Sequence, residues 1–356
     1  MSVAIVTGSS GLIGSAAATH FAHLGLDVVG VDNDMRQYFF GPDSSTQPNG
    51  IKLSADLGAR YTQVKADIRD RDALSDVFAR YGKNIALVVH AAGQPSHDWA
   101  TREPLTDFDV NAVGTMNMLE HTRQHCPDAA FVFTSTNKVY GDRPNHLPLI
   151  EHDTRWEIDP DHEYADGITE NMSIDSCLHS IFGVGKVAAD LAVQEYGRYF
   201  GMNTATFRCG TLTGPAHAAA ELHGFLAYLM RCAMEARTYR IFGYQGKQVR
   251  DAIHCADLVA AFEAFFRAPR QGEIYNMGGG RHSNTSLKEA VTLAEKITGE
   301  QMTTQYQDAN RVGDHIWWIG STAKFSSHYP GWAYRYDVEA ILTEIHQSNA
   351  ETWVRR

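Results

Sequence analysis

Three regularly spaced glycines, Gly8, Gly11 and Gly14, are the first residues of this chain with a recognisable chemical use. They follow the apolar run 3–6, which predicts a strand, and open the amphipathic stretch 13–24, which predicts a helix. Gly8 permits a tight turn, Gly11 lets the backbone approach a pyrophosphate, and Gly14 allows close helix packing. Because a helix N-terminus also favours anions, the run predicts a dinucleotide site. The cofactor contacts expected here are Gly8, Ser10, Gly11, Leu12 and Ile13.

A carboxylate ends the second predicted strand, which covers residues 28–31. Asp32 stands where such a group accepts both ribose hydroxyls of an adenosine, and it would repel a 2′-phosphate. NAD is therefore favoured over NADP. Asn33 is expected beside it. Asp67 and Ile68, after a third apolar run, either flank the adenine or form an ordinary acidic turn.

Six ordered motifs carry a resemblance to a known family. They are the glycine spacing G-x-x-G-x-x-G and the runs 90–93, 111–115, 134–142, 248–251 and 311–314. Over nearly its whole length the chain resembles the extended short-chain dehydrogenase/reductase family of nucleotide-sugar epimerases and dehydratases. Within that family it is similar to the CDP-paratose (CDP-tyvelose) 2-epimerases, on the run 135–142, the acidic insertion after it and the pair His179-Ser180.

The resemblance implies NAD, a nucleotide-sugar substrate and a set of contacts with them. On the nicotinamide side these are Ala91, Ala92, Gly93, Asn111 and Lys186. On the substrate side they are Gln94, Ser96, Asn137, Lys138, Arg250 and Arg311, the two arginines reaching a diphosphate. Related 4,6-dehydratases carry an Asp-Glu pair after a catalytic threonine, here Thr136. Because Lys138 cannot replace a carboxylate in that proton relay, the resemblance favours epimerisation through a transient keto-sugar, with hydride removal and return.

The family's Y-x-x-x-K motif is incomplete, because Phe182 stands where the tyrosine should be, four residues before Lys186. That spacing keeps both residues on one helical face, yet phenylalanine has no proton to exchange. Three interpretations remain open: an engineered Tyr→Phe variant, a catalytically silent NAD- or nucleotide-sugar-binding regulator, or an enzyme with another acid/base group. A dehydratase or oxidoreductase with a non-tyrosine base is a further alternative. The candidates for that base are Thr136, Cys177, His179 and Tyr164.

The elements that must position these residues read as repeated βαβ units. Short apolar runs at 85–89 and 130–133 predict further buried strands, each ending in polar residues. We therefore expect an α/β fold with a Rossmann-type doubly wound parallel sheet and a smaller C-terminal substrate-binding lobe. Residues 1–214 should form the NAD-binding domain and residues 215–356 mainly the nucleotide-sugar lobe. The polar stretches 35–60 and 143–176 are predicted as loops near the site.

Composition narrows the choice of partners. The chain has 356 residues and a formal net charge of −11, so nucleic acid is not an expected partner. Its five scattered cysteines lack metal-ligand spacing, and we expect no metal. No apolar run approaches the roughly 18 residues of a membrane span, and a strand begins almost at once, so a cytoplasmic protein is expected. Helices 100–122 and 180–200 resemble the pair that forms the family's homodimer interface.

Overall fold

The computed structural model describes residues 2–217, 224–310 and 313–353. These residues form two compact units, each assembled from separate stretches of the chain. The first unit contains the described residues up to Val139, Ser180–Arg208 and Val259–Tyr275; the second contains Tyr140–His179, Cys209–Leu258 and the described residues from Asn276 onward. Each unit has its own apolar core. Within the described ranges, no helix is both long enough and apolar enough to cross a membrane.

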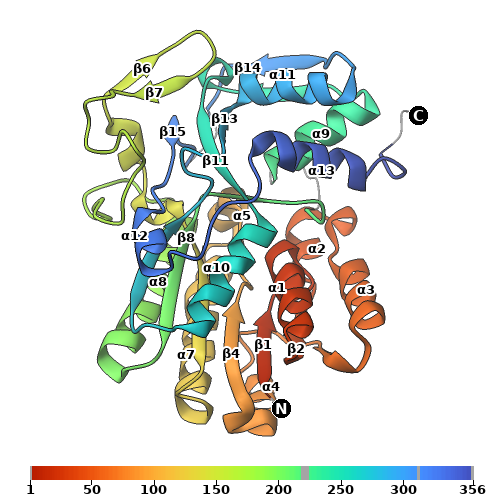
Figure 1. The fold of residues 1–356 in the computed structure, drawn as a ribbon, viewed down its shortest axis with the longest axis vertical. Helices are drawn as coiled ribbons and strands as arrows, with labels where there is room; N and C mark the ends of the chain where they lie inside the picture. Colours follow the sequence, from red (N-terminus) through yellow and green to blue (C-terminus); the bar gives the residue numbers. More distant parts are fainter. Residues whose placement is uncertain (1, 218–223, 311–312, 354–356) are drawn as a thin grey trace. The chain divides into compact units, whose positions relative to one another are not determined.

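The first unit is built on a seven-stranded sheet with the order β12-β8-β5-β4-β1-β2-β3 (Figure 1). The strands are β1 (Val3–Thr7), β2 (Asp27–Val31), β3 (Tyr61–Val64), β4 (Ile85–His90), β5 (Ala130–Thr136), β8 (Thr204–Cys209) and β12 (Glu273–Met277). β1 pairs in parallel with both β2 and β4. The winding direction therefore reverses at the carboxyl end of β1, where open parallel sheets bind their ligands.

Helices cover both faces of this sheet, because its strands are apolar on both sides. On one face, α1 packs against α3 and α10, and the rings of Phe21 and Phe266 meet edge-on at 5.9 Å between centroids. On the other face, α4, α7 and α8 share one core with the strands. The bounds are α1 (Leu12–His23), α3 (Gln47–Leu57), α4 (Arg71–Tyr81), α7 (Gly114–His125), α8 (Ile181–Phe200) and α10 (Cys255–Arg267). The predicted Rossmann-type doubly wound sheet is confirmed.

The stretch 35–60 differs from the prediction of a loop. It contains α2 (Met35–Phe40) and α3, joined by a short 3-10 turn. The loop prediction is wrong because the polar composition hides two anchors, Phe39 and Leu53, whose side chains are buried. Anchored helices of this kind draw their stability from packing rather than from composition.

The predicted helix 100–122 is also not continuous. α5 (His97–Arg102) ends before Pro104, which begins α6 (Pro104–Phe108), and a π-helical turn (Asp109–Val113) then leads into α7. Proline cannot donate to the preceding turn, but it is well suited to the first position of a new helix. The prediction of one helix is therefore wrong at Pro104.

The second unit is arranged around β11 (Val249–His254). This strand pairs antiparallel with β13 (Asn284–Ser286) and parallel with β9 (Thr211–Thr213) and β15 (Trp317–Trp318). The helices α9, α11 and α13 supply most of its apolar core. The remaining bounds are α9 (Phe225–Glu235), β10 (Tyr239–Phe242), α11 (Leu287–Thr298), β14 (Thr304–Gln307), α12 (Ala323–His328) and α13 (Val338–Ser348).

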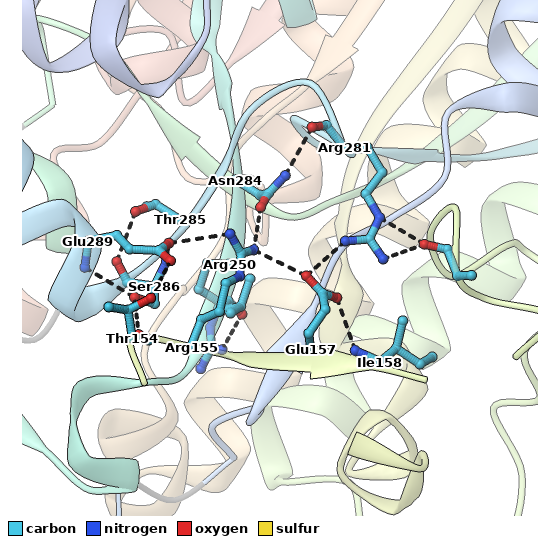
Figure 2. A network of polar contacts seen from close by, with 12 residues as sticks. Thr154, Arg155, Glu157, Ile158, Arg250, Arg281, Asn284, Thr285, Ser286 and Glu289 are labelled. Atoms are coloured by element: carbon cyan, nitrogen blue, oxygen red, sulfur yellow. Dashed lines mark hydrogen bonds and ion pairs between the residues drawn. The ribbon is translucent and has the colours of Figure 1, made fainter. Parts of the chain in front are cut away.

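The insertion 143–176 contains an antiparallel hairpin of β6 (Leu149–Glu151) and β7 (Trp156–Ile158). A polar network fastens this hairpin to the C-terminal part of the second unit (Figure 2). Arg155 forms an ion pair with Glu289 at 3.3 Å, and Glu157 forms one with Arg281 at 3.0 Å. The insertion is therefore held in place by several charge-assisted contacts.

Candidate active site

The glycine-rich turn has the geometry of a phosphate cradle. Gly8 has a φ of +65°, and a Cβ there would lie 2.9 Å from the backbone of Ala92. A Cβ on Gly14 would lie 2.0 Å from the carbonyl oxygen of Gly8. Gly11 is the N-cap of α1 and supplies no side-chain cap to the first amides of the helix. A side chain at these positions would fill the space, and the turn fits a dinucleotide pyrophosphate.

Asp32 lies at the end of β2, next to this turn. One of its carboxylate oxygens accepts the backbone N–H of Ser10 at 2.9 Å, and the other accepts that of Asp34 at 2.8 Å. Burial raises the pKa of Asp32 above its usual value, and these two hydrogen bonds oppose the rise. Each carboxylate oxygen can accept a second hydrogen bond, so two ribose hydroxyls fit the predicted role of Asp32.

The adenine-side candidates are already engaged with the protein. The Asn33 side chain donates to Asp67 at 2.9 Å, and Arg69 forms an ion pair with the same carboxylate at 2.7 Å. Ile68 is buried, and its Cδ1 lies 2.5 Å from the position that a Cβ on Gly114 would take. Asp67 and Asn33 are therefore fixed in position beside Asp32, while Ile68 contributes to the core.

Three of the predicted nicotinamide-side residues come together at the end of β4. A Cβ on Gly93 would lie 3.0 Å from Asn111 Oδ1 and 3.8 Å from Lys186 Nζ. Lys186 is buried, and its ammonium group donates to the carbonyl of Thr134 at 2.9 Å. Ala91 and Ala92 precede Gly93 in the segment that contacts the turn at Gly8. Residues distant in the sequence thus line one small area beyond the strand ends.

The end of β5 places the residues expected to contact the sugar. Thr136 is half-buried; its hydroxyl accepts the backbone N–H of Lys138 at 3.2 Å and lies 3.3 Å from Asn137 Oδ1. Gln94 and Ser96, also predicted to contact the sugar, form hydrogen bonds within the protein. The Gln94 amide donates to Asp107 at 2.7 Å, and Ser96 caps α5.

Phe182 is buried on α8, and its ring packs against a histidine. The rings of Phe182 and His97 lie 4.9 Å apart between centroids with an interplanar angle of 62°. His97 was not among the predicted bases, although it stands only four residues after Gly93. The predicted candidates His179, Cys177 and Tyr164 belong to the second unit, where His179 lies 3.7 Å from the Cys177 sulfur.

Sequence reasoning also missed two buried carboxylates. Asp190 is 1% exposed and forms an ion pair with Arg208 at 2.8 Å, while Ser135 donates to it at 2.6 Å. This pair joins α8 to β8 and to the strand end next to Thr136. The only available signal was that Asp190 follows Lys186 by one helical turn.

The second carboxylate, Asp107, is 1% exposed on α6. One of its oxygens accepts from Gln94 and Asn111, and the other makes no hydrogen bond among the described residues. That second oxygen lies 3.2 Å from the position of a Cβ on Gly185, so the glycine leaves the room it needs. Burial raises the pKa of Asp107 to about 6, against the opposing effects of its hydrogen bonds and of the positive charge of Lys186.

On the substrate side, the second unit places Arg250 on β11. The side chain is partly buried and forms an ion pair with Asp314 at 2.6 Å. The other predicted diphosphate residue, Arg311, lies outside the described residues. A guanidinium held by one carboxylate keeps further N–H groups that can bind phosphate oxygens.

Comparisons with known proteins show which family and fold the chain shares. Residues 4–278 match the model of the NAD dependent epimerase/dehydratase family. The chain is 30% identical to a CDP-paratose 2-epimerase from Salmonella typhi, over 82% of this chain and 83% of that protein. It is 26% identical to a dTDP-glucose 4,6-dehydratase from Shigella flexneri, over 84% and 80%. A UDP-glucuronic acid 4-epimerase from Bacillus cereus, solved with UDP-glucuronic acid and NAD, superposes with a TM-score of 0.78 at 21% identity and 99% coverage of both chains.

The fold and the glycine turn define a Rossmann-type nucleotide-binding protein of the extended short-chain dehydrogenase/reductase class. More narrowly, the chain belongs to the NAD-dependent epimerase/dehydratase family. Its cofactor is NAD, as that family's description states.

Proposed function

We propose that this protein epimerises a nucleotide-diphosphate sugar through a transient keto-sugar. The observation that carries the proposal is the convergence of Gly93, Asn111 and Lys186 beyond the end of β4, next to the phosphate cradle. The chemistry that NAD supplies when bound is hydride removal from a sugar carbon and hydride return to the opposite face. The protein supplies orientation and proton transfer.

We assign each of these tasks to particular residues of the chain. Asp32 holds the adenosine ribose, and Lys186 holds the nicotinamide ribose. Thr136 donates a hydrogen bond to a sugar hydroxyl at the reacting carbon. Arg250 binds the diphosphate, and Arg311 is proposed to join it. We further propose that residues 1–214 mainly hold the cofactor and residues 215–356 mainly the nucleotide sugar.

Epimerisation is preferred over dehydration because of the residues that follow Thr136. Asn137 and Lys138 stand where a dehydratase needs a proton-transferring carboxylate pair. Asn137 does not exchange protons, and a lysine ammonium does not act as a base in its charged form. The 30% identity to a CDP-paratose 2-epimerase supports the same choice. The other candidate, a catalytically silent regulator, is motivated by Phe182.

Two further proposals concern the oligomeric state of the enzyme and the compartment in which it works. Exposed apolar side chains at Ile181, Val184 and Leu191 recur along α8, at the spacing of one helical face. We propose that this face forms a homodimer interface. All five cysteines have free thiols, which suits a reducing compartment such as the cytoplasm.

A panel of CDP-, UDP-, dTDP- and GDP-sugars in deuterated water tests the reaction. We expect NMR to show one of them converted to an epimer by the protein with its bound NAD. Formation of a 4-keto-6-deoxy product would instead establish a dehydratase. Tight NAD binding without turnover across the whole panel would favour the regulator.

A further inference from the structure

Phe182 stands where the family has its catalytic tyrosine, so the hydroxyl of that tyrosine is absent. The side chain packed against Phe182 is His97, which can act as an acid or a base. The edge-on contact at 4.9 Å between the His97 and Phe182 centroids places the imidazole directly beside the phenylalanine ring. Imidazole is the side chain that gains and loses a proton most readily near neutral pH. The substitution of tyrosine by phenylalanine therefore does not leave this part of the first unit without a proton carrier.

Ser180 fixes the orientation of this imidazole. Its hydroxyl oxygen accepts the backbone N–H of Gly183 at 3.1 Å and so caps α8. The same oxygen lies 2.8 Å from His97 Nδ1. A serine hydroxyl oxygen has two lone pairs, so it can accept from both the Gly183 N–H and a proton on His97 Nδ1; in that tautomer Nε2 is the ring nitrogen that can take up a proton. The N-cap residue of α8 thus holds the imidazole of His97 in position through Nδ1.

The chain path brings His97 to the nicotinamide side. It is the first residue of α5, which packs against α8, and it follows the segment 91–93 after a short turn capped by Ser96. Gly93 in that segment approaches Asn111 and Lys186. His97 therefore lies on the same side of the sheet as the residues proposed to hold the nicotinamide ribose.

We propose that His97 is the catalytic acid/base of this enzyme, in place of the absent tyrosine. The inference rests on the proposed function. As a hydride leaves the sugar carbon for the cofactor, the proton of the hydroxyl on that carbon moves to Nε2 of the imidazole, and the C–O bond becomes a carbonyl. When the hydride returns to the opposite face, the imidazole gives the proton back to the oxygen. Atoms and charge balance over the cycle, with no external oxidant.

The test uses three variants of the full-length protein with its NAD. His97→Asn keeps a group that can hydrogen-bond to Ser180 but cannot carry the proton. His97→Gln is the second variant, in case the first alters the local fold. His23→Asn removes an exposed histidine at the end of α1 and is the matched control. For each variant, kcat is measured across pH, and the NAD dissociation constant is measured separately.

We expect His97→Asn and His97→Gln to lower kcat by about 10²–10⁴-fold, the usual contribution of a general acid/base. The NAD dissociation constant should stay within about threefold, and the pH-dependent limb of kcat should disappear. Phe182→Tyr in the His97→Asn background should recover part of the loss. An active parent with equally active His97 variants would overturn this inference alone. A parent with no turnover would overturn the proposed function and this inference with it.

Discussion

The backbone N–H of Ser10 donates to the Asp32 carboxylate at 2.9 Å, which joins the glycine-rich turn to the end of β2. This contact fixes the distance between the proposed pyrophosphate cradle and the proposed ribose-binding group. The two halves of the adenosine diphosphate site are therefore positioned before any cofactor binds, which lowers the ordering cost of binding.

The first prediction follows from that contact. Asp32→Ala should weaken NAD binding by roughly 10–100-fold, because hydrogen bonds to a charged group contribute about 1.5–3 kcal/mol. It should also reduce the discrimination against NADP. Fluorescence titration with both reduced cofactors measures this. Asp27→Ala, at the opposite end of β2, is the control and should bind normally. Equal affinity of the parent for the two cofactors would contradict the assignment of Asp32.

The second prediction concerns Phe182. With His97 as the acid/base, Phe182→Tyr should change kcat by less than about tenfold, because a tyrosine hydroxyl would duplicate an existing function. If the chain were instead an enzyme disabled by a Tyr→Phe change, Phe182→Tyr should raise kcat by about 10²–10⁴-fold. Lys186→Ala should weaken cofactor binding and slow turnover in either case. If Lys186→Ala bound NAD as tightly as the parent, the proposal that α8 lines the cofactor site would be wrong.

The third prediction concerns the pH dependence of stability. Because the pKa of Asp107 rises from 3.8 to about 6 on folding, the folded state binds its proton more tightly than the unfolded state. The resulting stabilisation is complete below pH 3.8 and is lost as the pH rises through about 6, by at most about 3 kcal/mol. Three groups near the Asp107 carboxyl lower its pKa and so oppose the effect of burial. They are the positive charge of Lys186 and the hydrogen bonds from the neutral amides of Gln94 and Asn111.

Urea denaturation between pH 4 and pH 7 measures this effect in the parent and in Asp107→Asn. The variant should lose this component of the pH dependence. Asp109→Asn, an exposed position two residues further along, is the control and should retain it. Parallel stability curves for the parent and Asp107→Asn would show that Asp107 does not titrate in this range.

The fourth prediction concerns assembly. Leu191 is 43% exposed on α8, and Leu191→Glu should convert the proposed homodimer into a monomer. Burying an unpaired charge in an apolar interface carries a large desolvation cost. Leu24→Glu, at the end of α1, provides a control of the same chemistry at a similarly exposed leucine. Sedimentation velocity at micromolar concentration is the measurement; a monomeric parent would refute the interface.

The sheet was predictable because its strands are short apolar runs bounded by polar residues, as at β1 and β4. The tight glycine turn was predictable because each of its glycines has a local steric reason. The helices of 35–60 were missed because their stability depends on two buried anchors, Phe39 and Leu53, rather than on a continuous apolar stripe.

The pairing of His97 with Phe182 could not be predicted for a different reason. The two residues lie far apart in the sequence, and although Phe182 stands out by its place in the motif, nothing in the sequence links it to His97. The same holds for Asp107 and Gly185, where a missing side chain on one helix makes room for a carboxylate on another. Such contacts depend on how α5, α6 and α8 pack, and neither periodicity nor spacing reports that.

The central claim is that the hydride removed from a sugar carbon returns to that carbon. The direct measurement uses the sugar nucleotide converted in the panel, deuterated at each ring carbon in turn, with mass spectrometry and NMR of the product. The account predicts an epimer of unchanged mass that retains deuterium at the inverted carbon, with no net reduction of NAD. Loss of that deuterium to solvent, loss of water from the sugar, or accumulation of reduced cofactor would contradict it.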